Sequence, residues 1–244
     1  MVIVRTVSSV AASKNWPLFQ MDVNNAFLQG DLFEEVYMDL PQGFHKHGEY
    51  KFLIDQTKDS LHSSFKVKDL GELRYFLGIE VMRSKKGVLL NQRKYALELI
   101  TDAGMSSCKP VATPIELNQK LTTVDYDSHV GKTYDTQLED IGSYQRLIGK
   151  LIYLTITRPD ICFAVQVLSQ FMQQPKKSHL YAALREVRYI KSAPGLGILL
   201  RRGHAPTLTA FCDSDWTACL NIRRSVIGYI VKLGDSLLSW KSKK

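Results

Sequence analysis

Residues 18–28 read LFQMDVNNAFL, a short predicted strand that runs into a tight turn. Phe19, Met21 and Val23 alternate with polar residues, and this period of two is typical of a strand with one buried face. Asp22 falls on the polar face, although aspartate is depleted in strands. Two explanations fit its position. The strand is an edge strand whose aspartate faces water, or a bound cation compensates the charge of the carboxylate.

Outward from this strand, the pattern of apolar residues predicts both helices and strands in the first half of the chain. A helix over 4–13 ends before Pro17, because the residue that precedes a proline is pushed out of the helical region. Residues 68–71 carry a turn signal. Strands are also expected at 35–38, 73–81 and 88–90. A helix at 59–65 has Asp59 as its expected cap. A second helix, at 92–102, has Asn91 as its expected cap and ends at Gly104.

The second half begins with residues 116–139, which are polar and rich in acids and are expected to form a mobile linker. Helices are predicted over 144–155, 161–172 and 179–191. In the last of these Ser178 is the expected cap, and the inward-facing residues are Leu180, Leu184, Val187 and Ile190. The strands predicted after it are 198–200, 208–212, 225–233 and 237–240.

The charge of the chain is unevenly distributed. The 244 residues, with 45% hydrophobic and 23% charged side chains, suit one large or two small globular domains. The net charge is +8, and although residues 1–50 carry −3, residues 201–244 carry +5. A basic carboxyl half suits a polyanion such as nucleic acid, and a solvated basic surface explains it equally well.

The cysteines and the apolar runs indicate an intracellular protein, cytoplasmic or nuclear. The four cysteines form no CxxC pair and have no histidine at metal-ligand spacing, which argues against zinc and against a disulfide framework. Reduced thiols are the simplest interpretation. No signal peptide is expected, and the longest apolar run, 147–157, is interrupted by Lys150 and too short to span a membrane.

Five stretches, in this order, resemble the Pol polyprotein of copia-type retrotransposons, a reverse transcriptase followed by a ribonuclease H. The resemblance covers nearly the whole chain. The stretches are 20–32 (QMDVNNAFLQGDL) with its continuation 35–44 (EVYMDLPQGF), 68–81 (KDLGELRYFLGIEV), 158–161 (RPDI), 211–216 (FCDSDW) and 223–225 (RRS).

The resemblance implies an α+β chain made of parts of several domains. Residues 1–115 are expected to be a reverse-transcriptase fragment with part of the palm, the primer-grip hairpin and the first thumb helix. Residues 116–142 would be a linker, 143–195 a helical connection region, and 196–244 the first antiparallel strands of a truncated ribonuclease H-like domain.

The resemblance also assigns roles in RNA-directed DNA synthesis. Such a polymerase uses two Mg²⁺ ions, which prefer carboxylate and phosphate oxygens. Asp22 would be one metal ligand, and Val23, Ala26 and Phe27 would contact the nucleotide, with Phe27 at the steric gate. A core aromatic is the alternative for Phe27. The partners implied are an RNA template, an RNA–DNA hybrid and a deoxynucleoside triphosphate, and the implied primer grip is Phe76, Leu77, Gly78, Ile79 and Glu80.

At the carboxyl end, Asp213 matches the first metal ligand of a ribonuclease H, and Asp215 is a second candidate. Without the resemblance, both acids would be read as turn-forming residues at a strand end. The helix that carries the catalytic glutamate and the later acids are expected after residue 244, so this domain is expected to be truncated.

Two motifs of the family are absent from the sequence. The chain has no Asp-Asp dipeptide, and therefore no Tyr-x-Asp-Asp turn, and it has no Ser-Leu-Tyr-Gly-Leu-Lys-Gln stretch. Phe44 joins almost directly to a segment that belongs far beyond both motifs, so residues 45–59 mark an internal deletion or an exon assignment that omits a block. One carboxylate does not offset two divalent ions beside a triphosphate, and we expect an inactive product. The alternatives are a non-catalytic nucleic-acid-binding remnant and a relic without function.

Overall fold

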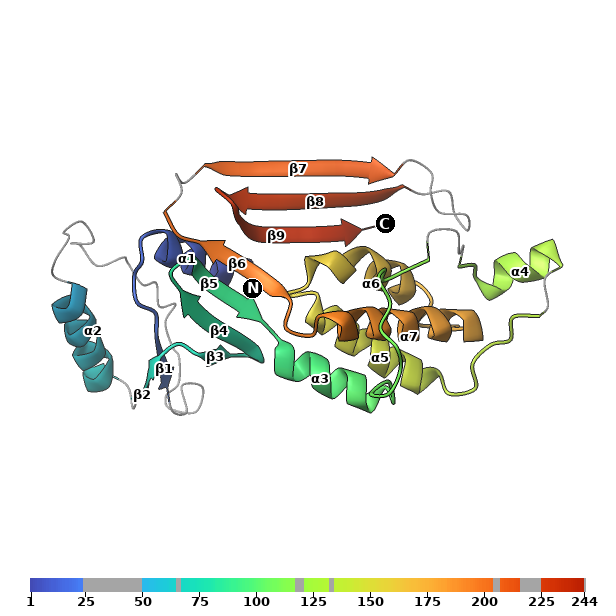
Figure 1. Cartoon of the computed structure of the whole chain (residues 1–244), viewed down its shortest axis with the longest axis horizontal. Helices are drawn as coiled ribbons and strands as arrows, with labels where there is room; N and C mark the ends of the chain where they lie inside the picture. Colours follow the sequence, from blue (N-terminus) through green and yellow to red (C-terminus); the bar gives the residue numbers. More distant parts are fainter. Residues whose placement is uncertain are drawn as a thin grey trace, which may run out of the picture. The chain divides into compact units, whose positions relative to one another are not determined.

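The chain is an α+β protein in which every paired strand is antiparallel (Figure 1). The computed structural model describes residues 1–23, 50–64, 67–116, 121–131, 134–203, 207–215 and 225–243. It divides into a smaller unit, residues 17–73, and a larger unit, residues 1–16 with 74–244. The expected α+β class is confirmed. None of the helices in the described ranges is both long enough and apolar enough to cross a membrane.

The smaller unit contains the strand with which the sequence analysis began. Strand β1 (Phe19–Val23) pairs with β2 (Val67–Glu72), and the helix α2 (Tyr50–Ser64) precedes β2. Lys58 of α2 contacts both strands, because its ammonium lies 2.7 Å from the carboxylate of Asp69 and 4.4 Å from the ring centre of Phe19. One helix side chain therefore holds α2 against the two-stranded sheet.

Two predictions for this unit are wrong. Asp59 lies inside α2 and does not cap it. The turn expected at residues 68–71 is part of β2, because the strand accommodates the turn residues as a β-bulge. Leu70 and Gly71 lie opposite the single residue Gln20, and Gly71 has a φ of +75°. The strand expected at 35–38 lies outside the described residues.

The larger unit is built on a four-stranded sheet of order β3-β4-β5-β6. The predicted hairpin around residues 85–87 is confirmed, whereas the single strand predicted over 73–81 is two strands. The chain turns at Leu77 and Gly78, whose φ angles of +47° and +71° are those of a tight two-residue hairpin turn. The strands are β3 (Tyr75–Phe76), β4 (Ile79–Ser84), β5 (Gly87–Asn91) and β6 (Gly197–Arg201).

The chain between β5 and β6 forms the helical part of the larger unit. The expected helices are confirmed within three residues at each end, and residues 159–161 form a 3₁₀ turn before α6. The helices are α3 (Arg93–Asp102), α5 (Ile141–Leu154), α6 (Cys162–Ser169) and α7 (Lys177–Ser192). The hydrophobic residues of their buried face are aliphatic apart from one aromatic residue, and they include Leu99, Tyr144, Ile148, Leu151, Leu168, Ala183, Val187 and Ile190.

Some details of this region differ from expectation. The expected linker contains the short helix α4 (Val124–Val130). Lys176, not Ser178, is the N-cap of α7. Leu180 and Leu184 are only half-buried, because the side of α7 that packs inward is rotated toward His179 and Glu186, both fully buried.

A three-stranded sheet completes the larger unit: β7 (Leu208–Asp215), β8 (Val226–Leu233) and β9 (Ser236–Lys243). The first helix, α1 (Val2–Ser13), packs against β5, β6 and β9 (Figure 1). The guanidinium of Arg5 lies 3.9 Å from the ring centre of Trp240, and Trp240 Nε1 donates to Thr155 O at 3.1 Å. The two ends of the chain are thus packed together.

Gly87 begins β5 opposite Arg201 of β6, and we expect Gly87→Ala to destabilise the larger unit by about 2 kcal/mol. Its φ is +138°, and an added Cβ would lie 2.0 Å from Leu200 O. The matched control is Gly149→Ala in α5, where nothing lies within 4 Å of the added carbon. There we expect a gain of about 0.5–1 kcal/mol. Urea unfolding of both variants measures the difference, and equal effects would contradict the prediction.

Candidate functional site

Asp22 lies on β1 with its side chain exposed. Its partner across the sheet is Lys68 of β2. Side chains of directly opposed residues in an antiparallel pair project from the same face of the sheet. The charge that faces Asp22 across the sheet is therefore an ammonium and not a second carboxylate.

The neighbouring acid of β2 is already engaged. Asp69 is opposite Met21, so its side chain projects from the other face of the sheet than that of Asp22. It accepts hydrogen bonds from Lys58 Nζ at 2.7 Å and from Gly71 N at 2.8 Å, and the bond from Lys58 is the main cause that lowers its pKa.

The described part of the smaller unit does not fit a two-metal polymerase site. Among all residues that the structure describes, no group of three histidine, cysteine, aspartate or glutamate side chains is placed to hold a metal ion. The backbone of Val23 belongs to β1, and its predicted contact with the nucleotide stays a prediction. Ala26 and Phe27 lie outside the described residues, and their predicted contacts with the nucleotide stay predictions.

The residues predicted as a primer grip form the tight β3–β4 hairpin of the larger unit. Phe76 pairs with Ile79 on either side of the turn, and Leu77 is 62% exposed at its tip. Tyr153 of α5 fixes the turn from the helical side, because its hydroxyl donates to Leu77 O at 2.5 Å. A Cβ at Gly78 would lie 3.0 Å from that hydroxyl oxygen, so a larger residue would have to displace the Tyr153 hydroxyl, and the positive φ of Gly78 also favours glycine.

Glu80, the last residue of the predicted primer grip, has a structural partner. Its Oε1 accepts a hydrogen bond from Lys94 N, at 2.8 Å, in the first turn of α3. A carboxylate at a helix N-terminus satisfies one of the free backbone amides there and is stabilised by the helix dipole. Glu80 therefore joins the hairpin to α3.

The two acids predicted for a ribonuclease H site lie on β7. Asp213 and Asp215 are two residues apart on one strand, which puts them on one face of the sheet. Asp213 is exposed and accepts a hydrogen bond from Ser214 N at 2.9 Å. The structure describes the backbone of Asp215 opposite Val226, but not its side chain. Within the described residues no further carboxylate completes a metal-binding group around them.

Asp213 borders an open cleft of about 440 Å³ between the β7–β9 sheet and the start of α6. Most of the wall is apolar, with Phe163 on the helical side and Phe211, Ile230 and Trp240 on the sheet. A hard divalent cation needs several oxygen ligands. Among the described side chains, the one carboxylate at the border of this apolar cleft does not meet that requirement.

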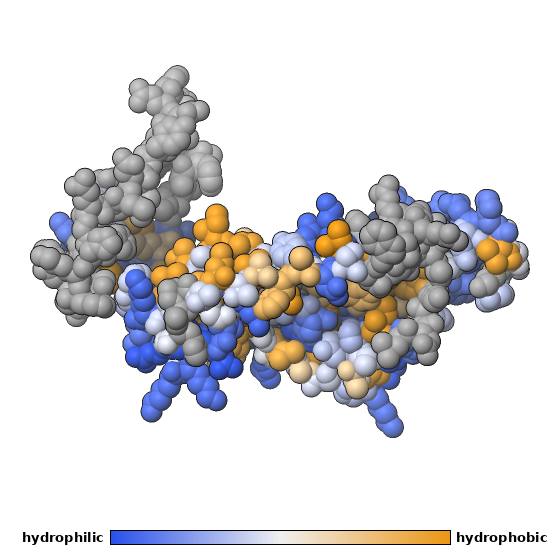
Figure 2. Space-filling view, turned by 90° about the horizontal axis from the view of Figure 1, so that it is seen from above, coloured by the Kyte–Doolittle hydropathy of each residue, from blue (hydrophilic) through white to orange (hydrophobic). Residues whose placement is uncertain are grey.

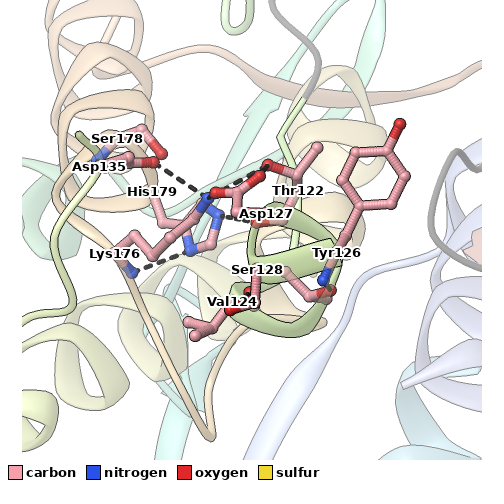
Figure 3. Close-up of polar contacts among 10 residues, drawn as sticks. Thr122, Val124, Tyr126, Asp127, Ser128, Asp135, Lys176, Ser178 and His179 are labelled. Carbon is pink, nitrogen blue, oxygen red and sulfur yellow. Dashed lines mark hydrogen bonds and ion pairs between the residues drawn. The ribbon is translucent and has the colours of Figure 1, made fainter. Parts of the chain in front are cut away.

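A buried polar cluster, which the sequence analysis missed, connects the expected linker to α7 (Figure 3). Lys176, only 2% exposed, makes ion pairs with Asp127 of α4 and with Asp135, and its Nζ also donates to Thr122 Oγ1 at 3.1 Å. His179 accepts from Lys176 N at 3.0 Å through Nδ1 and donates through Nε2 to Thr122 O at 3.1 Å. We call these five residues the Lys176 cluster.

The Lys176 cluster has a structural role, because it holds the segment around α4 against the start of α7. Burial, and then the charge of Lys176, lower the pKa of His179 to about 4, so this imidazole is neutral at pH 7. Burial alone would raise the pKa of Asp127 and Asp135. Hydrogen bonds, including those from Lys176, outweigh it and hold both pKa values below the usual range. Each charge thus meets its opposite, and no group is left free to act as a nucleophile.

Glu186 is a second buried polar group that periodicity did not reveal. It is fully buried on α7, and within the described chain neither carboxylate oxygen has a hydrogen-bond partner. Burial, reinforced by the charge of Asp160, raises its pKa well above the usual value. Asp160 itself is bound by Arg158 at 2.8 Å, which keeps its pKa low although burial opposes this. Glu186 is therefore a neutral acid in an apolar bundle.

A sequence signal for the Lys176 cluster exists, but it is weak. A lysine at the start of a helix with a histidine three residues later has the spacing of a capping box, which the structure contains. The usual residues at these positions are serine or threonine and glutamate. The two aspartates lie in a polar acidic segment, and such a segment is usually solvated.

The comparisons with known proteins agree with the motifs. The family described as "Reverse transcriptase (RNA-dependent DNA polymerase)" matches residues 1–53 and 47–117. A retrovirus-related Pol polyprotein from transposon RE2 of Arabidopsis thaliana is 34% identical over 308 aligned positions that cover 99% of this chain. The chain belongs to the reverse transcriptase family of copia-type retrotransposons.

Two further relatives are covered by this chain to different extents. An uncharacterized mitochondrial protein of Arabidopsis thaliana is 35% identical over 81% of this chain and 78% of its own length. A Pol polyprotein from transposon TNT 1-94 of Nicotiana tabacum is 28% identical over the whole chain and 23% of its own length. The chain spans about a fifth of the RE2 polyprotein. No solved structure matches it.

Lys176→Met tests whether the Lys176 cluster stabilises the larger unit. The substitution leaves Asp127 and Asp135 without their ammonium partner, and we expect the larger unit to lose about 3 kcal/mol of unfolding free energy. The control is Lys150→Met, which removes the exposed pair of Lys150 with Asp102 and should cost less than about 1 kcal/mol. Denaturant unfolding at pH 7 measures both, and a loss for Lys176→Met no larger than the control would show that the cluster is dispensable.

The buried imidazole of His179 makes stability depend on pH. It stays neutral in the folded protein down to about pH 4, whereas an unfolded histidine binds a proton near pH 6.5. At this residue the unfolded state therefore binds more protons in this window. The contribution of His179 to the free energy of unfolding falls by up to about 3 kcal/mol as the pH drops from about 6.5 to about 4.

Thermal melts between pH 7.5 and 4 measure this loss, with His179→Gln as the control. That variant should be less stable at pH 7 and should lose less stability on acidification. The aspartates of the cluster have lowered pKa values and titrate below this window. The raised pKa of Glu186 makes its own contribution to stability rise as the pH drops. Because both proteins contain Glu186, the difference between their two pH profiles reports His179. An identical pH profile for the two proteins would refute the role of His179.

Proposed function

We propose that this chain is a retrotransposon-derived fragment of a reverse transcriptase and ribonuclease H that no longer performs RNA-directed DNA synthesis. One observation carries the proposal: Asp22, which matches the first metal ligand of the polymerase motif, faces Lys68 across a two-stranded sheet. The chain has no Asp-Asp dipeptide from which the other two carboxylates of such a site would come.

The physical argument is one of charge. Two-metal nucleotidyl transfer needs ligands that hold two divalent cations, Mg²⁺ by resemblance, a few ångströms apart beside a triphosphate. Asp22 supplies one negative charge, and the ammonium of Lys68 on the same face opposes a cation. Asp69 projects from the other face and is held by Lys58. The described residues around Asp22 thus support binding of at most one weakly held metal ion.

An internal deletion is part of the proposal. It is supported by the family match, which falls into two segments that overlap at residues 47–53, inside the proposed junction at 45–59. It is also supported by the alignment with the RE2 polyprotein, whose 308 positions exceed the 244 residues of the chain by 64. An exon assignment that omits a block would give the same result, and the genomic DNA around the codons for residues 44–60 distinguishes the two.

The finer domain assignment follows the same resemblance. Residues 1–115 are proposed as the palm and primer-grip part, residues 116–142 as the linker, and residues 143–195 as the helical connection region. The sheet β7–β9 is proposed as the first strands of a ribonuclease H-like domain, with Asp213 and Asp215 at its metal-ligand positions. An intracellular location, cytoplasmic or nuclear, belongs to the same proposal.

Nucleic-acid binding without catalysis is the second candidate function. The observations that favour it are the net charge of +8 and the well-ordered β3–β4 hairpin, whose tip is exposed and fixed by Tyr153. The proposed ligand is an RNA–DNA hybrid, bound through phosphate contacts. Such contacts release counterions and make affinity fall steeply with salt.

The first proposal predicts no primer extension on an RNA template with deoxynucleoside triphosphates and either Mg²⁺ or Mn²⁺. Asp22→Ala should leave the background unchanged, because the wild-type site does not hold two metals. An intact reverse transcriptase run in parallel shows that the assay works. Extension by the wild type that Asp22→Ala abolishes would overturn the proposal of inactivity.

Filter binding of the same preparation to an RNA–DNA hybrid separates the two candidates. If the chain is a binding remnant, the logarithm of its affinity should fall linearly with the logarithm of salt concentration, by about 0.9 per phosphate neutralised. Binding that is absent at low salt, or insensitive to salt, would argue for a relic without nucleic-acid contacts.

A further inference from the structure

Strand β7 has a free edge. The sheet order is β7-β8-β9, so β7 pairs with β8 on one side, and no strand pairs with its other side in the part of the chain that the structure describes. Figure 1 shows it as the outer strand, with β9 next to the remainder of the larger unit. All eight residues from Leu208 to Asp215 pair with β8 in one continuous register without a bulge. The outward side is therefore an uninterrupted row of backbone donors and acceptors.

This edge lacks most of the features that usually prevent association. Natural edge strands are blunted by charged side chains, lysine above all, and by proline, bulges or short length. The sequence of β7, LTAFCDSD, contains neither a basic residue nor a proline, and its two charged residues, Asp213 and Asp215, lie together at one end. Leu208 and Phe211 are 67% and 57% exposed. Figure 2, seen from the side on which β7 lies, shows apolar surface there.

We propose that β7 pairs in antiparallel fashion with β7 of a second copy of this chain, so that two three-stranded sheets become one. An antiparallel pair of identical strands is related by a two-fold axis, and every contact is made twice. The self-pairing satisfies the outward backbone groups of both strands with groups of the same kind.

The charges on β7 favour antiparallel over parallel pairing. Asp213 and Asp215 lie at one end of the strand, whereas residues 208–210 are uncharged. In an antiparallel pair centred on Phe211 or Cys212, the acids of each copy lie beside the uncharged end or the middle of the other strand. Parallel in-register pairing would place each acid next to its own copy, which is destabilising.

The expected complex is weak. One pair of eight-residue strands, with the side chains around them, buries less than the roughly 1,200 Å² at which stable interfaces begin. We therefore expect a reversible dimer whose fraction rises with protein concentration. The full chain is monomeric when dilute.

Two charge variants test whether the dimer forms through the edge of β7 or through the face of the sheet. Phe211→Glu puts a carboxylate on β7 that meets either its own copy or Asp213 of the second copy, in both central registers. Lys232, whose ammonium lies 5.8 Å from the Phe211 ring centre, offers it a counter-charge within the monomer. The control is Ile230→Glu, because Ile230 is opposite Phe211 on the same face but belongs to the central strand β8. Ile230 is also exposed, at 39%.

Sedimentation velocity of the full-length proteins over a concentration series is the measurement. We expect the wild type to dimerise, Phe211→Glu to weaken the dimer about tenfold or more, and Ile230→Glu to change it less than about threefold. A wild type that stays monomeric up to about 1 mM overturns the proposal. So does a dimer that Phe211→Glu leaves intact, or one that Ile230→Glu abolishes equally, since that result indicates packing through the face.

Hydrogen exchange on the wild type keeps the test decisive if a variant fails to fold. Amides of β7 should exchange more slowly as the protein concentration rises, whereas those of β9 should not change. Exchange in β7 that does not depend on concentration overturns the proposal.

Discussion

The pairing of β5 with β6 is the constraint on which the larger unit depends. It joins residues 87–91 to residues 197–201, in a continuous register from Gly87 opposite Arg201 to Asn91 opposite Gly197. Every helix from α3 to α7 lies in the chain between these strands, so the pair closes a long loop whose conformational entropy must be offset by burial. The residues that offset it are Val88, Leu90, Ile198 and Leu200, all at most 5% exposed.

Local elements were predictable where the local pattern is strong. Amphipathic spacing found the bundle helices to within three residues, and Gly234-Asp235 marked the β8–β9 hairpin. Prediction was wrong where a distant partner decides the outcome. Residues 68–71 look like a turn and become a strand, because β1 is available to pair with them. The partner of β6, more than a hundred residues earlier, leaves no trace in its own sequence.

For the candidate site, too, the residue pattern was predictable and the contacts between distant residues were not. The motif around Asp22, together with the other stretches that follow it in the same order, predicted the family, because the order of residues is read directly from the sequence. The residues that surround Asp22 depend on how β1 and β2 are paired, and only the structure places Lys68 opposite Asp22. The Lys176 cluster escaped prediction for a related reason. Aspartates in a polar segment are normally solvated, and only the approach of α7 turns Asp127 into a buried counter-ion.

The contact of Arg5 with Trp240 has a consequence for how the chain is made. The larger unit is assembled from residues 1–16 and 74–244, with the smaller unit inserted between them. Helix α1 is therefore synthesised well before its docking partner β9, because 222 residues separate Ser13 from Ser236. At about 5–20 residues per second, the packing face of α1, which holds Arg5, Ser8, Ser9, Ala11 and Ala12, stays uncovered by β9 for on the order of ten seconds or more. During this interval Arg5 lacks the ring of Trp240 against which its guanidinium packs.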